Sequence, residues 1–147
     1  MPKHASVTEA AELAEKGATY VDVRSTREFA SGHAAGAMNV PLLEPDEVTG
    51  QMQPNPDFMH VMQAVFKPET PLLIGCQMGG RSMRAAQMLE SFGFTDVTNV
   101  RGGFGGARDP MGRSVDPGWA ESGLPVESGQ PADRSYAALA ARADAEQ

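Results

Sequence analysis

The residue best suited to covalent chemistry is Cys76, the only cysteine among 147 residues. An apolar run ends at this thiol, a glycine-bearing loop follows it, and a helical pattern begins near Arg81. A strand, loop and helix in this order direct backbone N–H groups and the positive helix end into one small space. A thiolate in that space is stabilised, and so is an anion that approaches it. The pattern therefore predicts that Cys76 is a nucleophile, although an isolated cysteine is usually a buried structural thiol.

The loop after Cys76 has the composition of an anion-binding cradle. Gly79 and Gly80 permit the backbone angles that a tight ring of amides requires. A cation such as Arg81 is unfavourable at a helix start unless an anion lies nearby, so we expect Arg81 to close the loop rather than to be an ordinary surface residue. The residues predicted to form the cradle are Gln77, Met78, Gly79, Gly80, Arg81 and Ser82.

The elements around this loop alternate between strands and helices. The apolar pattern predicts strands at residues 19–24, 37–41, 72–74 and 97–100. It predicts helices in residues 6–17, after Ser25, at 57–66 and at 82–92, the last with a buried stripe of Ala85, Met88, Leu89 and Phe92. Residues 72–74 lack polar alternation, which is typical of a central parallel strand covered on both faces. We therefore predict an α/β fold with a mostly parallel central sheet and helices on both faces.

The remaining segments are expected to be irregular or terminal. Prolines and glycines predict a loop at residues 42–56 and a long irregular loop at 102–118. A packed segment at 119–126 is expected to close a domain spanning residues 1–127. Residues 128–147 are predicted to be a linker followed by an alanine-rich helical tail.

Three blocks of sequence resemble the rhodanese family. Residues 22–41 are similar to its first signature block, and residues 76–82 match its active-site loop, Cys-x-x-Gly-x-Arg-Ser. Residues 100–103, Trp119 and residues 123–125 resemble its closing block. The resemblance covers roughly residues 6–127 and implies a rhodanese-like domain. It also implies sulfurtransferase activity. The loop cysteine attacks the outer sulfur of a small anionic donor such as thiosulfate, and the resulting persulfide is collected by cyanide, by a thiol or by a sulfur-accepting protein.

By position, the resemblance makes Cys76 the persulfide carrier and residues 77–82 its cradle. Asp22 and Arg24 become scaffold residues that brace neighbouring loops, and His33 becomes a residue that holds a turn. One departure from short rhodaneses is the fifteen residues, 104–118, between the glycine pair and Trp119. We expect this insertion to lie beside the pocket mouth and to shape access for the acceptor.

Other readings of the same loop stay open. The chain could be a sulfur carrier or regulatory rhodanese-like module, including one whose thiol senses oxidants. A phosphatase or arsenate reductase-type enzyme is less favoured, because cysteine phosphatases place five residues between cysteine and arginine. Here four residues separate Cys76 from Arg81, and the shorter ring suits a single sulfur atom better than four phosphate oxygens.

The composition narrows the class of partner and the setting. A net charge of −7 and a pI near 4.9 argue against nucleic acid or an anionic membrane as partner. Three scattered histidines and one cysteine have no metal-ligand spacing, so neither a metal nor another cofactor is expected. The start of the sequence lacks a secretory pattern, and no apolar run is long enough to span a bilayer. A lone cysteine also fits a reducing compartment, so a cytoplasmic location is expected.

Overall fold

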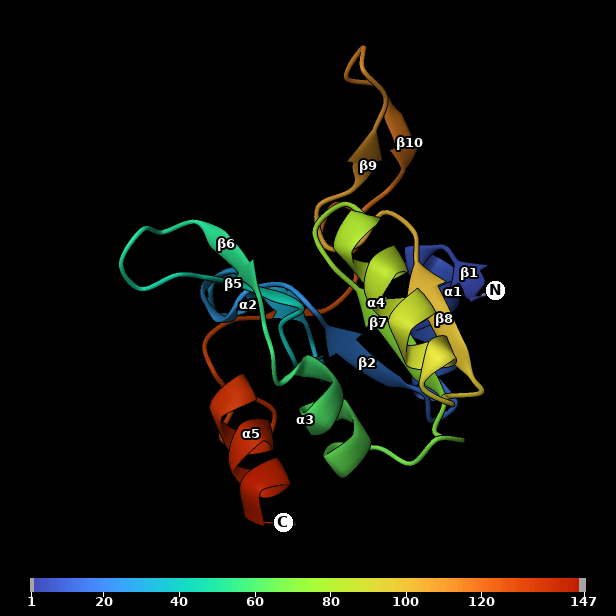
Figure 1. Ribbon diagram of the computed structural model, residues 1–147. Coiled ribbons are helices and arrows are strands. Elements are labelled where there is room, and N and C mark those ends of the chain that lie inside the picture. Colours follow the sequence, from blue (N-terminus) through green and yellow to red (C-terminus); the bar gives the residue numbers. More distant parts are fainter. Residues whose placement is uncertain (1, 146–147) are drawn as a thin grey trace.

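The computed structural model describes residues 2–145 and is built on a five-stranded parallel sheet (Figure 1). Residue 1, at the start of the predicted domain, lies outside the described residues. So do residues 146–147, at the end of the predicted tail. In spatial order the strands are β1 (Lys3–Ala5), β8 (Val97–Val100), β7 (Leu72–Gly75), β2 (Thr19–Asp22) and β4 (Met38–Asn39). Each neighbouring pair is parallel, and β7, the strand that leads into Cys76, is central.

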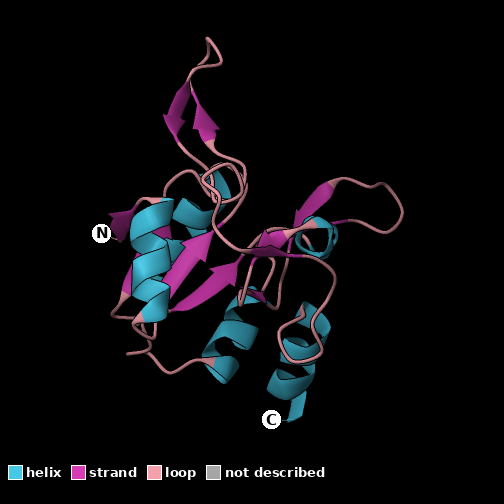
Figure 2. Cartoon of the chain, turned by 180° about the vertical axis from the view of Figure 1, so that it is seen from behind, coloured by secondary structure: helices cyan, strands magenta, loops and turns pink. Residues whose placement is uncertain are grey.

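Helices cover both faces of this sheet, as the sequence predicted (Figures 1 and 2). On one face lie α3 (Phe58–Val65), α4 (Gly80–Ser91) and α5 (Tyr136–Ala145), which share one hydrophobic cluster. On the other face, α1 (Val7–Glu15) and α2 (Thr26–Ser31) contribute to a second cluster around Trp119. Strand β7 supplies Leu72 and Ile74 to the first cluster and Leu73 to the second. Burial on both faces explains why its sequence has no polar alternation.

Two segments that the sequence predicted as loops contain short antiparallel hairpins. Strands β5 (Leu43–Pro45) and β6 (Met52–Pro54) form one, and β9 (Ala107–Arg108) and β10 (Ser114–Asp116) form the other. Both hairpins extend from the body of the molecule in Figure 1. Because most of their residues are exposed, neither carries the apolar alternation by which a half-buried strand is recognised. A further short ladder joins β3 (His33–Ala34) to β11 (Val126–Glu127).

The buried stripe of α4 differs from the predicted one. Ser82, Ala85, Ala86 and Leu89 are buried, whereas Met88 and Phe92 are 36% and 57% exposed. Both stripes have helical spacing, so the sequence alone does not choose between them. The inward direction of Ser82, which contacts buried polar groups at the end of the sheet, selects the observed face.

Among residues 2–145, no helix combines the length and the apolar character needed to cross a membrane. Within the same residues, no group of three or more His, Cys, Asp or Glu side chains is arranged to hold a metal ion.

Candidate active site

Cys76 lies where β7 gives way to α4, at the carboxyl edge of the central strand. Its side chain is 2% exposed, and Sγ accepts a hydrogen bond from the backbone N–H of Gly79 at 3.0 Å. Gly79 precedes the first turn of α4 with φ +114°, in the left-handed region that favours glycine. The sulfur is therefore held against an amide at the positive end of a 12-residue helix whose first turn contains no acidic residue.

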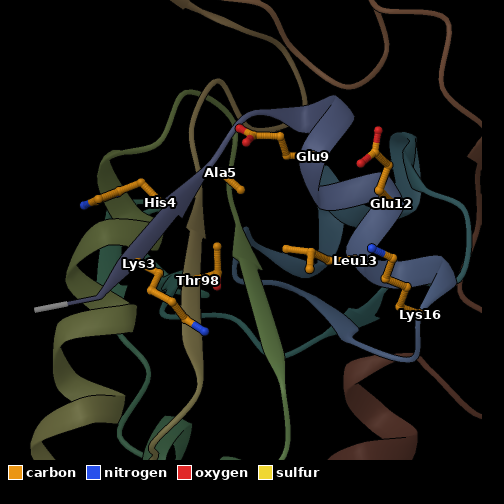
Figure 3. Close-up of a pocket in the computed structure, with 8 residues that line it drawn as sticks. All are labelled: Lys3, His4, Ala5, Glu9, Glu12, Leu13, Lys16 and Thr98. Atoms are coloured by element: carbon orange, nitrogen blue, oxygen red, sulfur yellow. The ribbon is translucent and has the colours of Figure 1, made fainter.

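The loop above Cys76 is partly open to solvent. Gln77 and Gly79 are half-buried, Gly80 is exposed, and Met78 is 56% exposed. Because the thiol itself is buried, a small donor has to reach it past these loop residues. The pocket of about 310 Å3 drawn in Figure 3 lies elsewhere, between β1, Thr98 and α1, and contains none of the loop residues.

The start of the predicted insertion supports the loop from behind. The N–H groups of Phe104 and Gly105 donate to the carbonyl oxygens of Cys76 (2.7 Å) and Gln77 (2.9 Å). Gly103 has φ +56°, and a Cβ atom there would lie 2.3 Å from the Cys76 carbonyl oxygen. The backbone at 103–105 thus packs directly on the loop, which leaves no room for a side chain at Gly103. The glycine pair at 102–103 was the only sequence signal of this contact.

Arg81 connects the loop and the start of α4 to α2. Its guanidinium donates to both carboxylate oxygens of Glu28, at 2.7 and 3.0 Å. This hydrogen bond is the main cause that lowers the pKa of Glu28 from 4.5 to about 2, and it also raises the pKa of Arg81. The sequence did not identify Glu28 as the partner, because the pair lies 53 positions apart in the chain and Glu28 is otherwise explained as a helix-capping residue near Ser25.

Asp22 and Arg24 form a buried ion pair that reaches the loop. The Asp22 carboxylate accepts hydrogen bonds from Nε and Nη2 of Arg24 (2.8–3.1 Å). The same guanidinium donates to Gln77 Oε1 at 3.1 Å and to the Gly32 carbonyl at 2.6 Å, and it lies 4.6 Å from the centre of the Phe104 ring. One buried cation thus contacts β2, the turn after α2, the loop and the insertion.

His33 does not join this group of contacts. Its ring is fully buried and stacked on Phe29. Nδ1 lies 2.7 Å from the Phe29 carbonyl oxygen, and Nε2 lies 2.9 Å from Glu127 Oε1. Both ring nitrogens contact acceptors in the turn and in β11. These contacts hold the turn, and none of them suits a general base at Cys76.

Ser82 and Asn99 complete the surroundings of the sulfur. Ser82 Oγ lies 3.4 Å from Cys76 Sγ and 2.6 Å from Asn99 Oδ1. The loop pattern included Ser82, but Asn99 on β8 was missed. The available signal was a pair of polar residues, Thr98 and Asn99, between the two valines of the strand Val97–Val100.

Comparison with known proteins identifies a family and relatives that match most of the chain. Residues 6–108 match the family described as the rhodanese-like domain. The chain is 37% identical over 128 residues to thiosulfate sulfurtransferase 16, chloroplastic, of Arabidopsis thaliana, a match that covers 87% of this chain and 95% of the relative. It is 36% identical over 98 residues to human thiosulfate:glutathione sulfurtransferase, covering 63% of this chain and 80% of that protein.

A solved structure has the same fold. The crystal structure of Rv0390 from M. tuberculosis superimposes with a TM-score of 0.70 at 26% identity, over 86% of this chain and 98% of the other. The predicted fold class is confirmed by this likeness together with the parallel sheet of the chain itself.

Proposed function

The chain belongs to the family of rhodanese-like domains, and on this premise we propose that it is a sulfurtransferase with Cys76 as its nucleophile. The donor is a small anion that carries a sulfane sulfur, of the thiosulfate kind. Two relatives whose names include "sulfurtransferase" match the chain at 36–37% identity, which supports this class of reaction.

The observation that carries the proposal is the position of the Cys76 sulfur. It lies at the start of α4 with an amide hydrogen bond from Gly79 at 3.0 Å. Thiolate, not thiol, is the reactive form, and a helix start with an inward N–H favours the anion. The same features favour a persulfide, because its charge resides on sulfur next to the same donors.

The proposed reaction has two balanced steps. In the first, the Cys76 thiolate attacks the outer sulfur of the donor. A bond from Sγ to that sulfur forms, the sulfur–sulfur bond of thiosulfate breaks, and sulfite leaves with the electron pair. In the second, cyanide or a thiolate attacks the terminal persulfide sulfur, and the Cys76 thiolate is released.

An external acceptor is needed because the chain has no second cysteine to resolve the persulfide. A low-molecular-weight thiol, cyanide or a thiol on a partner protein would each serve. The human relative's name pairs thiosulfate with glutathione, which supports a thiol acceptor for this chain as well.

Intact-mass measurement after treatment with thiosulfate tests the first step. We expect the parent protein to gain the mass of one sulfur atom and to lose it on addition of cyanide, while Cys76→Ser gains nothing. A matched control is Cys76→Ser combined with Ser128→Cys, which restores one thiol at an exposed position outside the loop. That control should stay unmodified, because its thiol has no cradle.

Two results would contradict the proposal. A parent protein that gains no sulfur from any sulfane donor would support a regulatory or binding module instead. Hydrolysis of an aryl phosphate, lost in Cys76→Ser and faster than sulfur transfer, would support phosphatase chemistry in spite of the four-residue spacing.

A further inference from the structure

A row of polar side chains leads from the Cys76 thiol to the edge of the sheet. Sγ lies 3.4 Å from Ser82 Oγ, which lies 2.6 Å from Asn99 Oδ1, and Asn99 Nδ2 lies 3.4 Å from Nδ1 of His4. Cys76, Ser82 and Asn99 are buried, whereas His4 is exposed on β1. The row therefore connects the buried sulfur with the protein surface.

The register of the sheet places these groups on one face. Asn99 on β8 is opposite His4 on β1 and Ile74 on β7, so the three side chains point the same way. That face is covered by α4, which supplies Ser82 from its first turns. In Figure 3 the His4 side chain extends from β1 away from Glu12 and Leu13 of α1, which lie across the pocket on the opposite face.

The hydroxyl of Ser82 has one hydrogen and several acceptors around it. Gly79 O lies at 3.0 Å and Asn99 Oδ1 at 2.6 Å. When the Ser82 hydroxyl hydrogen points to Asn99 Oδ1, the shorter of these two contacts, Ser82 Oγ can only accept a hydrogen bond from the Cys76 thiol. This arrangement suits a protonated Cys76, but it offers no hydroxyl hydrogen to a thiolate, which accepts and cannot donate.

Asn99 can reverse this arrangement because its amide carries a donor and an acceptor on one group. After a half-turn of the amide, Nδ2 donates to Ser82 Oγ, and the hydroxyl hydrogen is left with Gly79 O and Sγ as acceptors. The thiolate is the charged one of the two and therefore the stronger acceptor. Oδ1 then faces His4, whose Nδ1 can carry a hydrogen and donate to it. Every hydrogen bond in the row now runs toward the sulfur.

On the premise that Cys76 is the nucleophile, we propose that Asn99 is a positioning residue that turns the Ser82 hydroxyl hydrogen toward the Cys76 thiolate. It does not touch the reacting atoms; it acts through Ser82. The sulfur then has two donors, the Gly79 N–H and the Ser82 O–H, and both remain available to the inner sulfur of a persulfide.

The test is the rate at which iodoacetamide alkylates Cys76 across a range of pH, followed by intact mass. This readout reports the thiolate and does not depend on sulfur transfer. A hydrogen bond to an anion is strong enough that its loss in Ser82→Ala should slow alkylation about tenfold at neutral pH and move the pH profile to higher pH. Asn99→Ala should give a similar decrease, because nothing then holds the hydroxyl in the donating direction.

A double-mutant comparison separates positioning from a general structural effect. If Asn99 acts through Ser82, adding Asn99→Ala to Ser82→Ala should slow alkylation no further. Thr98→Val is the matched control: Thr98 is the buried neighbour of Asn99 on β8 but points to the opposite face, and its alkylation profile should equal that of the parent. Should Asn99→Ala fail to fold, Asn99→Leu keeps the approximate size of the side chain and removes its donor without adding a charge, so it should slow alkylation as well.

The outcomes distinguish this inference from the proposed function. Asn99 variants that fold and alkylate at the parental rate and pH would overturn the inference, even if the parent accepts sulfur from thiosulfate. Additive slowing in the double variant would also overturn it. Slowed, non-additive alkylation in a protein that never accepts sulfur would support the row of donors while the proposed function fails.

Discussion

At the scale of single residues, several side chains around Cys76 each hold two parts of the site together. The Glu28 carboxylate accepts from the backbone N–H of Ser25 at the start of α2 and also pairs with Arg81 on α4. The Arg24 guanidinium neutralises Asp22 and also orients the Gln77 side chain. A buried charge is tolerated only when it is paired and hydrogen-bonded, so these contacts are coupled to folding as well as to the shape of the loop.

The pair Glu28–Arg81 gives a prediction about pH. The pKa of Glu28 is lowered to about 2 in the folded protein from an ordinary value of 4.5, so the stability that its charge contributes is complete above about pH 4.5 and is lost as the pH falls toward 2. Glu28→Gln should therefore lower the free energy of unfolding by about 1 kcal/mol near pH 6, since the pair is partly open to solvent. Urea denaturation at several pH values measures the difference.

This difference between parent and Glu28→Gln should shrink steadily below about pH 4.5. Glu15→Gln, which changes an exposed carboxylate of α1, serves as the control and should track the parent throughout. A gap between parent and Glu28→Gln that stays constant from about pH 6 to pH 3 would mean that the pair does not stabilise the fold through charge.

At the scale of elements, the parallel strands and their helices could be predicted from the sequence, whereas contacts between distant segments could not. Residues 72–74 are all apolar, which is typical of a strand buried on both faces, so β7 could be predicted. Cys76 and its loop were recognisable because their chemistry is local. Glu28 and Asn99 were not, because the partner of a polar side chain depends on how elements pack and leaves no local pattern.

The hairpin of β9 and β10 was missed for a related reason: its large apolar side chains, Met111 and Val115, are exposed and leave no pattern of burial in the sequence. Its base, however, is firmly attached. The N–H of Gly106 donates to Gly102 O, and Trp119 N donates to Gly103 O. The ion pairs that Arg108 and Arg113 make are exposed and contribute little to stability. The hairpin is thus an appendage on a rigid base that contacts the Cys76 loop.

Deleting residues 107–116 and joining the ends through a short glycine link tests what this appendage does. The backbones of Gly106 and Gly118 are in contact, so closure is undemanding and the free energy of unfolding should change by less than about 1 kcal/mol. We expect sulfur loading from thiosulfate to stay within about twofold of the parent, because the backbone hydrogen bonds at 104–105 that hold the loop remain in place. Transfer to a bulky thiol should become faster relative to transfer to cyanide, because the hairpin rises from the segment that packs on the Cys76 loop and its removal opens the approach to that loop.

The control for the deletion is Met111→Ser, which keeps the hairpin but removes an exposed apolar side chain near its tip. It should leave the ratio of the two acceptor rates unchanged. If the deletion changes neither donor nor acceptor kinetics, the hairpin has no part in access to Cys76.

At the scale of the whole molecule, the C-terminal helix belongs to the main core. Leu139 and Ala143 of α5 are buried in the same cluster as Ile74 and Leu89. The segment before α5 is tied to the body, since Arg134 donates to the Ala37 carbonyl and pairs with Glu127. The division into residues 1–127 and 128–147 stays a prediction from composition, and it does not make the tail dispensable. The sequence of an alanine-rich helix gives little indication of which face is buried, because a single leucine among alanines produces only a weak amphipathic pattern.

The last prediction follows from this packing. Leu139 is fully buried, so Leu139→Ala leaves a cavity in the main core and should lower the free energy of unfolding by about 2–5 kcal/mol. Ala137→Ser, on the exposed side of α5, should change it by less than about 0.5 kcal/mol. Urea denaturation followed by tryptophan fluorescence is suitable because Trp119 lies in the other cluster, across the sheet. A single transition of the Trp119 signal that Leu139→Ala shifts to lower urea would mean that α5 and the Trp119 side unfold together. A Leu139→Ala transition that coincides with the parent would show that α5 is not part of the cooperative core, and a chain ending at residue 127 should then fold unaided.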